Sequence, residues 1–158
     1  MEQSAERRGL GTYGFRFGES AELPLCGLFA VGHEREASAS YSWDGMERTD
    51  GPLLLFQYTV SGGGAAEIED RSRRIEEGQA LLVEIPGRHR YYLPEDREHW
   101  EFYFILMNPR LILPVWEEAK AKLGEVASLP PDSEPIRLLQ QIVRDAQAGR
   151  IDGPYAAS

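Results

Sequence analysis

Four short apolar or alternating runs between residues 53 and 107 constrain the fold of this chain more than any other feature. The clearest are the apolar runs at residues 53–60, 80–85 and 100–107. Turns bearing Gly or Pro separate them, and residues 69–72 form a charged hairpin tip. Short runs at this spacing are typical of an antiparallel sandwich or barrel, and no helix-length periodicity interrupts them. We therefore predict a compact β unit, a small barrel.

The length and composition indicate one domain with, at most, an appendage. A chain of 158 residues with 42% hydrophobic residues is long enough to bury a full core. It has no stretch of eighteen apolar residues, and its N-terminus lacks the apolar centre of a secretory signal. The single cysteine, Cys26, lies in an apolar run, where we expect it to pack in the core. These features predict a cytoplasmic protein without a membrane contact.

The net charge of −9 argues against nucleic acid as a direct partner. The densest basic cluster is Arg71, Arg73 and Arg74, and acidic residues surround it on both sides. Phosphate binding relies on clustered Lys and Arg, so we expect no direct nucleic-acid binding by this chain.

The chain divides into three predicted segments. Residues 1–9 form a flexible charged arm, residues 10–107 the β-barrel, and residues 108–158 a helical extension. Within the barrel, residues 32–36 are expected to return to solvent after an apolar strand.

Two helices are predicted in the extension. The spacing over residues 114–123 places Trp116, Ala119 and Leu123 on one face, with Gly124 as the stop. A stronger helix covers residues 134–148, and its apolar positions are Ile136, Leu139, Val143 and Ala146. This stripe faces either the barrel or a second subunit. Residues 152–158 have the pattern of a further helix start, so we expect the chain to end within that helix.

The order of several motifs resembles the N-terminal sensor domain of AraC-type transcriptional regulators, which is a cupin-like barrel. These motifs are Arg48, the small-residue turn at 61–64, Gly78, the Pro86, Gly87, His89 and Tyr91 turn, and the aromatic run at 100–104. The resemblance covers residues 25–148. It implies a cupin-like (double-stranded β-helix) barrel followed by C-terminal helices, with no enzymatic activity and no cofactor. The barrel would bind a small-molecule effector and the helices would form a homodimer. The helix-turn-helix modules that bind DNA in whole regulators are not in this sequence.

The resemblance implies that the Arg48 side chain points inward and holds a polar ligand. The sequence alone indicates a solvated arginine. A guanidinium presents a fixed fork of donors suited to hydroxyl or carboxylate oxygens. His89 and Tyr91 are two residues apart on an extended segment and so share a face. They line the cavity or close its rim, or His89 makes an orienting hydrogen bond within its turn.

On the run at 100–107, Trp100, Phe102 and Phe104 point one way, and Glu101, Tyr103 and Ile105 point the other. The first set matches the family's cavity-facing positions. Phenylalanine at 102 and 104 favours a flat, apolar effector over a sugar. For these rings and for Met46, filling the core is the simpler alternative, and lining the cavity the second.

The alternative function is a stand-alone metal-dependent cupin enzyme acting on a small substrate. Metal-binding cupins carry a His-x-His motif on an early strand and another His on a later strand, and His89 resembles that later His. The chain has no His-x-His motif, and its other histidines, His33 and His99, are each isolated. We therefore predict no metal and no catalytic residues. A third alternative, a structural dimerisation module with a filled barrel, predicts no ligand-sized cavity.

Overall fold

The computed structural model describes residues 10–15 and 27–151. The strands in these ranges are β1 (Gly11–Gly14), β2 (Gly27–Glu36), β3 (Ser42–Asp44), β4 (Leu53–Gly62), β5 (Gly64–Ile68), β6 (Arg71–Ile75), β7 (Gln79–Ile85), β8 (His89–Tyr92), β9 (Trp100–Asn108) and β10 (Val126–Ser128). The helices are α1 (Leu113–Leu123) and α2 (Glu134–Gln147). The predictions for Cys26, for the arm at 1–9 and for the helix start at 152–158 lie outside the described residues.

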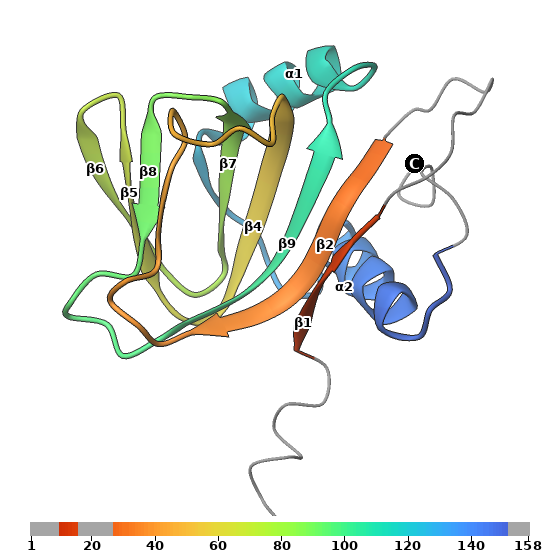
Figure 1. The fold of residues 1–158 in the computed structure, drawn as a ribbon, viewed down its shortest axis with the longest axis horizontal. Coiled ribbons are helices and arrows are strands. Elements are labelled where there is room, and N and C mark those ends of the chain that lie inside the picture. The colour runs from red at the N-terminus through yellow and green to blue at the C-terminus, as the bar shows by residue number, and fades with distance from the viewer. Residues whose placement is uncertain (1–9, 16–26, 152–158) are drawn as a thin grey trace, which may run out of the picture.

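The strands form two antiparallel sheets that face each other (Figure 1). The six-stranded sheet has the order β1-β2-β9-β4-β7-β10, and the four-stranded sheet has the order β3-β8-β5-β6. The mainly β architecture followed by helices is as predicted. Closure differs from the prediction, because no backbone ladder joins the two sheets in the described part of the chain. The domain is therefore an open sandwich whose two inner faces share one core.

Strand β9 lies between β2 and β4 and divides the apolar residues between the two faces of the six-stranded sheet. Trp100, Phe102 and Phe104 join the core between the sheets. Tyr103 and Ile105 pack on the outer face with the residues of α2. The predicted alternation is thus confirmed, and it follows from the period of two that a strand imposes on its side chains.

One tight turn and one close packing contact shape the four-stranded sheet. Glu69 and Asp70 join β5 to β6 with φ angles of 48° and 66°, both in the left-handed region that a two-residue type I′ hairpin requires. This confirms the charged hairpin tip. At the start of β5, a Cβ on Gly64 would lie 2.3 Å from Cε3 of Trp100, so only glycine allows the indole to approach the strand this closely.

Helix α2 covers the outer face of the six-stranded sheet (Figure 1). Its buried side chains are the four predicted ones, Ile136, Leu139, Val143 and Ala146. They belong to the second core cluster, on the opposite side of the sheet from the core between the sheets. The predicted stripe therefore packs within the chain.

Helix α1 lies over one end of the sandwich (Figure 1) and buries Trp116 alone. The predicted face is wrong at its C-terminal end, because Leu123 is 45% exposed. Gly124 ends the helix as predicted, and its N–H donates to the Lys120 carbonyl at 2.7 Å. The strand that follows, β10, pairs with β7, so the segment after residue 108 also contributes to the sheet. No helix in the described residues is both long and apolar enough to cross a membrane.

Candidate functional site

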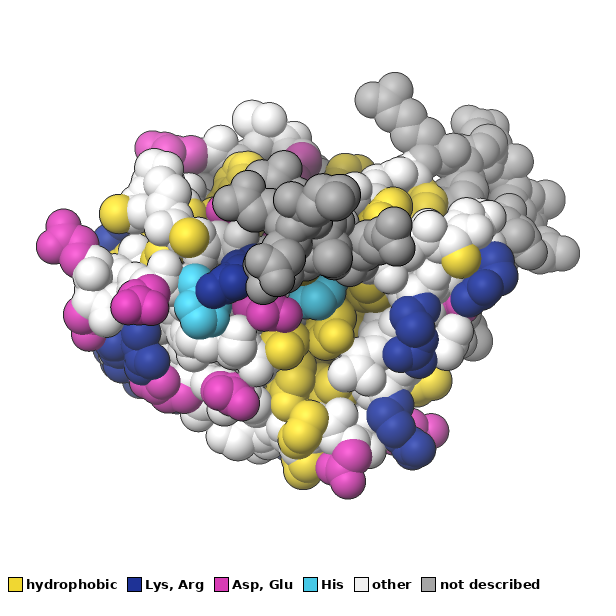
Figure 2. Space-filling view, turned by 90° about the horizontal axis from the view of Figure 1, so that it is seen from below, with side chains coloured by type: hydrophobic (Ala, Val, Ile, Leu, Met, Phe, Trp, Pro, Cys, Tyr) yellow, Lys and Arg dark blue, Asp and Glu magenta, His cyan; other side chains and the backbone are white. Residues whose placement is uncertain are grey.

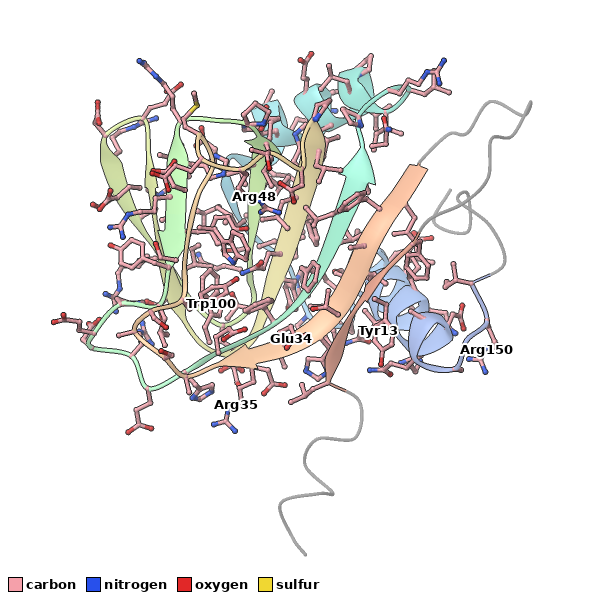
Figure 3. All side chains as sticks on the ribbon, in the orientation of Figure 1. Tyr13, Glu34, Arg35, Arg48, Trp100 and Arg150 are labelled. Carbon is pink, nitrogen blue, oxygen red and sulfur yellow. The ribbon has the colours of Figure 1, made fainter. Side chains whose placement is uncertain are left out.

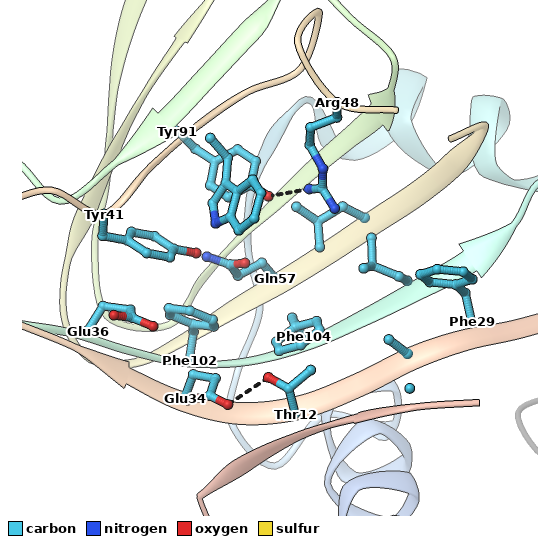
Figure 4. A pocket seen from close by; sticks show the side chains of 15 residues that line it. Thr12, Phe29, Glu34, Glu36, Tyr41, Arg48, Gln57, Tyr91, Phe102 and Phe104 are labelled. Atoms are coloured by element: carbon cyan, nitrogen blue, oxygen red, sulfur yellow. Dashed lines mark hydrogen bonds between the residues drawn. The ribbon is translucent and has the colours of Figure 1, made fainter. Parts of the chain in front are cut away.

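A cavity of about 460 Å³ lies between the two sheets and opens to solvent. Its lining residues come from β1, β2, β3, β4, β8, β9 and the loops beside β3 (Figure 4). They are Thr12, Gly14, Phe29, Ala30, Glu34, Glu36, Tyr41, Trp43, Arg48, Leu55, Gln57, Tyr91, Phe102, Phe104 and Leu106. Four of the six predicted site residues are among them: Arg48, Tyr91, Phe102 and Phe104. Their role in binding stays a prediction, but the fold brings them together in one cavity.

Arg48 lies in the loop between β3 and β4, and its guanidinium is held by two neighbours. Nε donates to Oδ1 of Asp50 at 3.1 Å and Nη2 donates to Oδ2 at 2.5 Å, while Nη1 donates to the hydroxyl of Tyr91 at 2.8 Å. The guanidinium also lies 4.7 Å from the ring centre of Trp43. Burial opposes the charged form of Arg48, but the hydrogen bond to Asp50 and the charges of Asp50, Tyr91 and Tyr41 together outweigh it and raise the pKa of Arg48. The same hydrogen bond lowers the pKa of Asp50.

Three polar side chains from different elements present donors to the middle of the cavity. Burial raises the pKa of Tyr91 to about 12 and raises the pKa of Tyr41 well above its usual value, so both hydroxyls stay protonated. Gln57 is 2% exposed, and its Nε2 faces the hydroxyl of Tyr41 (Figure 4). Within the described residues, that Nε2 makes no hydrogen bond of normal geometry. A buried donor without a well-aligned acceptor destabilises the folded state, so this amide N–H can gain a hydrogen bond from a ligand oxygen.

The apolar wall of the cavity is built around β9. The rings of Phe102 and Phe104 lie 6.1 Å apart, and Tyr41 lies 5.9 Å from Phe102. Gly32 lies opposite Phe104 on β2, and a Cβ there would be 2.6 Å from the Phe104 ring. The glycine therefore allows the Phe104 ring to approach β2 closely.

Two carboxylates on β2, Glu34 and Glu36, line the cavity, and sequence reasoning missed both. Residues 32–36 were expected to return to solvent, but β2 continues through Glu36. Glu34 pairs across the ladder with Phe102, and Glu36 pairs with Trp100. Directly opposed residues share a face of the sheet, so both carboxylates point inward with these rings. Figure 4 shows them on the side of the cavity opposite Arg48.

Signals for these missed residues are present in the sequence. Gln57 is a polar residue in the middle of the apolar run at 53–60. It pairs with Phe104 across the ladder, which places it on the inner face. Glu34 and Glu36 continue the alternation of β2 beyond its last apolar residue. Figure 3 places Glu34, Arg48 and Trp100 around the space between the sheets.

His89 is buried but lies outside this cavity. It lines a separate hollow of about 210 Å³ near α1, with Lys120 and Glu125. Its backbone N–H donates to the Gly87 carbonyl at 2.9 Å, and its ring stacks on Tyr91 at 6.0 Å. Its Nε2 has no hydrogen-bond partner in the described residues. Burial, assisted by the charge of Arg48, lowers the pKa of His89, so the ring is neutral at physiological pH.

Met46 is 62% exposed and lines none of the cavity, so the expectation that it fills the core is wrong. It lies in the turn after β3, where its backbone N–H donates to Oδ1 of Asp44 at 2.9 Å. This turn directs the Met46 side chain to solvent, and two residues later the chain brings Arg48 inward.

The sequence matches the family model described as "AraC-like ligand binding domain" over residues 32–157, which is more than half of the chain. The chain belongs to this family. The resemblance to AraC-type sensor domains is thereby confirmed, as is the fold class of a cupin-like β domain followed by C-terminal helices. A domain of this family is a regulatory ligand-binding domain. No curated protein matches the chain closely enough to be called a relative.

Several solved structures are similar to this AraC-like domain at low sequence identity. ToxT from Vibrio cholerae O395, bound to (E)-4-(8-methylnaphthalen-1-yl)but-3-enoic acid, has a TM-score of 0.48 and 13% identity over 80% of this chain and 50% of that one. YhaK from Escherichia coli has a TM-score of 0.48 and 14% identity over 63% and 44%. A cupin 2 conserved barrel domain protein from Salinispora arenicola CNS-205 has a TM-score of 0.44 and 13% identity over 70% and 84%. The chain spans about half the length of ToxT and of YhaK.

The side chains of this AraC-like domain do not fit the metal site of metal-binding cupins. In the ranges 10–15 and 27–151, no three His, Cys, Asp or Glu side chains lie together in a way that would hold a metal ion. His89, the histidine that resembles a cupin ligand, is outside the cavity.

Proposed function

We propose that this chain is the ligand-sensing and dimerisation domain of an AraC-type transcriptional regulator, without enzymatic activity. The observation that carries this proposal is the cavity of about 460 Å³ between the sheets. Its volume is within the range of small-molecule sites, and its walls are mostly apolar with a few polar groups, as such sites usually are. A structural module with a filled core would have no space of this size.

In this proposal the effector contacts Arg48, Tyr91, Phe102 and Phe104 together. The cavity is lined by both sheets and by the loop that carries Arg48, so an effector inside it touches parts that no backbone ladder connects among the described residues. A ligand shifts a conformational equilibrium only by its differential affinity for the two states. An effector that binds more tightly when sheets and loop close around it would therefore favour the closed arrangement. DNA-binding modules of the regulator, rather than this acidic domain, would read out the change.

A second copy of the chain is the partner proposed for the helices. An apolar groove runs between the two helices and the sheet, and Phe56, Trp116 and Leu138 are among its lining residues. Leu138 is 57% exposed in the single chain, although α2 already buries its opposite face. Figure 2 shows one face of the molecule, on which hydrophobic side chains gather between charged ones. Two copies related by a two-fold axis can bury an apolar surface such as this groove.

The proposal is tested with Nile red, a neutral apolar dye whose fluorescence rises when it leaves water. We expect saturable binding to the purified chain. Gly14 lines the cavity, and a Cβ there would have no neighbour within 4 Å, so Gly14→Trp fills the cavity without a backbone clash. This variant should lose dye binding, whereas Glu117→Trp on the exposed side of α1 should keep it. Equal binding by both variants would place the dye elsewhere and contradict the proposal.

A further inference from the structure

The charge of Arg48 is already compensated within the protein. Two of its nitrogens donate to the carboxylate of Asp50, and a third donates to Tyr91. Three of its five N–H groups are thus engaged, and Asp50 supplies a full opposing charge beside it. An anionic ligand would therefore meet a neutral ion pair at this end of the cavity rather than a free cation.

The opposite side of the cavity carries two negative charges without a compensating cation among the described residues. Glu34 accepts a hydrogen bond from the Thr12 hydroxyl at 2.6 Å, which leaves its charge in place. No Lys, Arg or His side chain in the ranges 10–15 and 27–151 forms an ion pair with Glu34 or Glu36. Burial and the neighbouring Glu34 raise the pKa of Glu36. The cavity lining, with Asp50 included, therefore has an excess of negative charge.

The space between these charges has aromatic walls and unfilled hydrogen-bond donors. Phe102, Phe104 and Tyr41 present ring surfaces to it, and such surfaces attract cations as well as apolar groups. The Nε2 of Gln57, more than nine-tenths buried, lines the same cavity and faces the Tyr41 hydroxyl without a hydrogen bond of normal geometry in the described residues. The Tyr91 oxygen accepts from Arg48, which leaves its proton to donate. A ligand oxygen placed here would satisfy these donors.

We propose that the cavity takes an organic amine, a molecule with an aromatic or other apolar body, an oxygen that accepts hydrogen bonds and a protonated amino group. The amino group lies at Glu34 and Glu36, the oxygen at Gln57 and Tyr91, and the body against Phe102 and Phe104. This inference rests on the proposed function, because it names the chemical class of the effector that the same cavity would sense.

The test uses three probes with the same phenoxy body and the same chain length, whose terminal groups are positive, neutral and negative: 3-phenoxypropylamine, 3-phenoxypropan-1-ol and 3-phenoxypropionate. Binding of each to the purified chain is measured by calorimetry at neutral pH. We expect the amine to bind about tenfold more tightly than the alcohol, and the acid to bind most weakly. A factor of ten corresponds to the interaction of one cation with a partly screened carboxylate pair.

The isosteric variants Glu34→Gln and Glu36→Gln should each weaken binding of the amine several-fold and leave the alcohol unchanged. Glu95→Gln, at an exposed position outside the cavity, changes the net charge equally and should have no effect. Tighter binding of the acid, or amine binding that survives Glu34→Gln/Glu36→Gln, overturns the inference. If Nile red binds but none of the three probes does, the amine inference fails and the sensing cavity stands. If Nile red does not bind either, both proposals fail.

Discussion

Arg48 donates a hydrogen bond from Nη1 to the phenolic oxygen of Tyr91 at 2.8 Å, and this contact joins the loop after β3 to the inner face of β8. On its other side the Tyr91 ring stacks on His89. One tyrosine therefore connects the large cavity to the buried histidine behind it. The loop, the cavity wall and the hollow near α1 are thus linked through a single side chain.

Arg48→Ala and Tyr91→Phe should be coupled in their effects on stability. Removing Arg48 leaves Asp50 without its ion-pair partner and costs about 1–3 kcal/mol, whereas Tyr91→Phe removes one hydroxyl and costs about 1 kcal/mol. Because they share one hydrogen bond, the double variant should lose less than the sum, by about 0.5–1 kcal/mol. Urea unfolding of the four proteins measures this difference. Additive losses would show that the contact contributes nothing.

The stability of the domain should fall as the pH is lowered through the range in which free histidine titrates. Burial holds the pKa of His89 below 6.5 in the folded chain, so between those two pKa values the unfolded chain binds more protons. The free energy of unfolding therefore rises with pH there, and the contribution is complete above pH 6.5. Urea unfolding at pH 5 and pH 7 checks the direction. His89→Gln cannot titrate and should show a smaller difference; an equal difference in both proteins would exclude His89 as its source.

Gly64→Ala should destabilise the domain by about 1–3 kcal/mol, because overpacking of a close-packed core carries costs of this size. The new methyl group would lie 2.3 Å from the ring of Trp100, which is completely buried. The indole cannot move freely, since its Nε1 donates to Thr59 at 3.0 Å. Gly14→Ala is the matched control, with no atom within 4 Å of the added Cβ. Thermal unfolding should show a loss for Gly64→Ala alone, and equal midpoints would refute this packing.

Leu138→Asp should convert a dimer into monomers without unfolding the chain. The side chain is 57% exposed in the single chain, so a polar replacement should change its stability by no more than about 0.5 kcal/mol. In the dimer, the same position would bury an unpaired charge. Sedimentation velocity compares the variant with Leu111→Asp, an exposed position outside the groove. A dimer that survives Leu138→Asp, or a wild-type chain that sediments as a monomer, contradicts the assignment of this surface.

Several parts of the fold could be predicted from residue patterns within single strands and helices. The alternation of Trp100, Phe102 and Phe104 on β9 and the buried stripe of α2 both emerged as predicted, because a strand or helix imposes its own period on its side chains. The motif order also identified the family before the fold was known. The alternation and the stripe depend only on residues close together in the chain, and the motif order only on their sequence along it.

Other features depended on pairing between distant segments. Glu34 and Glu36 face inward because β2 stays hydrogen-bonded to β9 beyond its last apolar residue, opposite Phe102 and Trp100. Met46 and Leu123 are apolar but exposed, because a turn and a helix end direct them to solvent. His89 lies in the motif that identified the family, but its ring packs closely against Gly45 and Gly87 and stacks on Tyr91. It therefore lies outside the cavity.

The sequence by itself determined the alternation of β9, the buried stripe of α2 and the family, and the resemblance to that family pointed to four of the cavity residues. Only the tertiary structure decided the charge of the cavity. That charge is set by which carboxylates share a face with the aromatic rings and by the pairing of Arg48 with Asp50. The first depends on the register between β2 and β9, and the second on the geometry of the loop after β3. Neither can be deduced from the pattern of one strand alone.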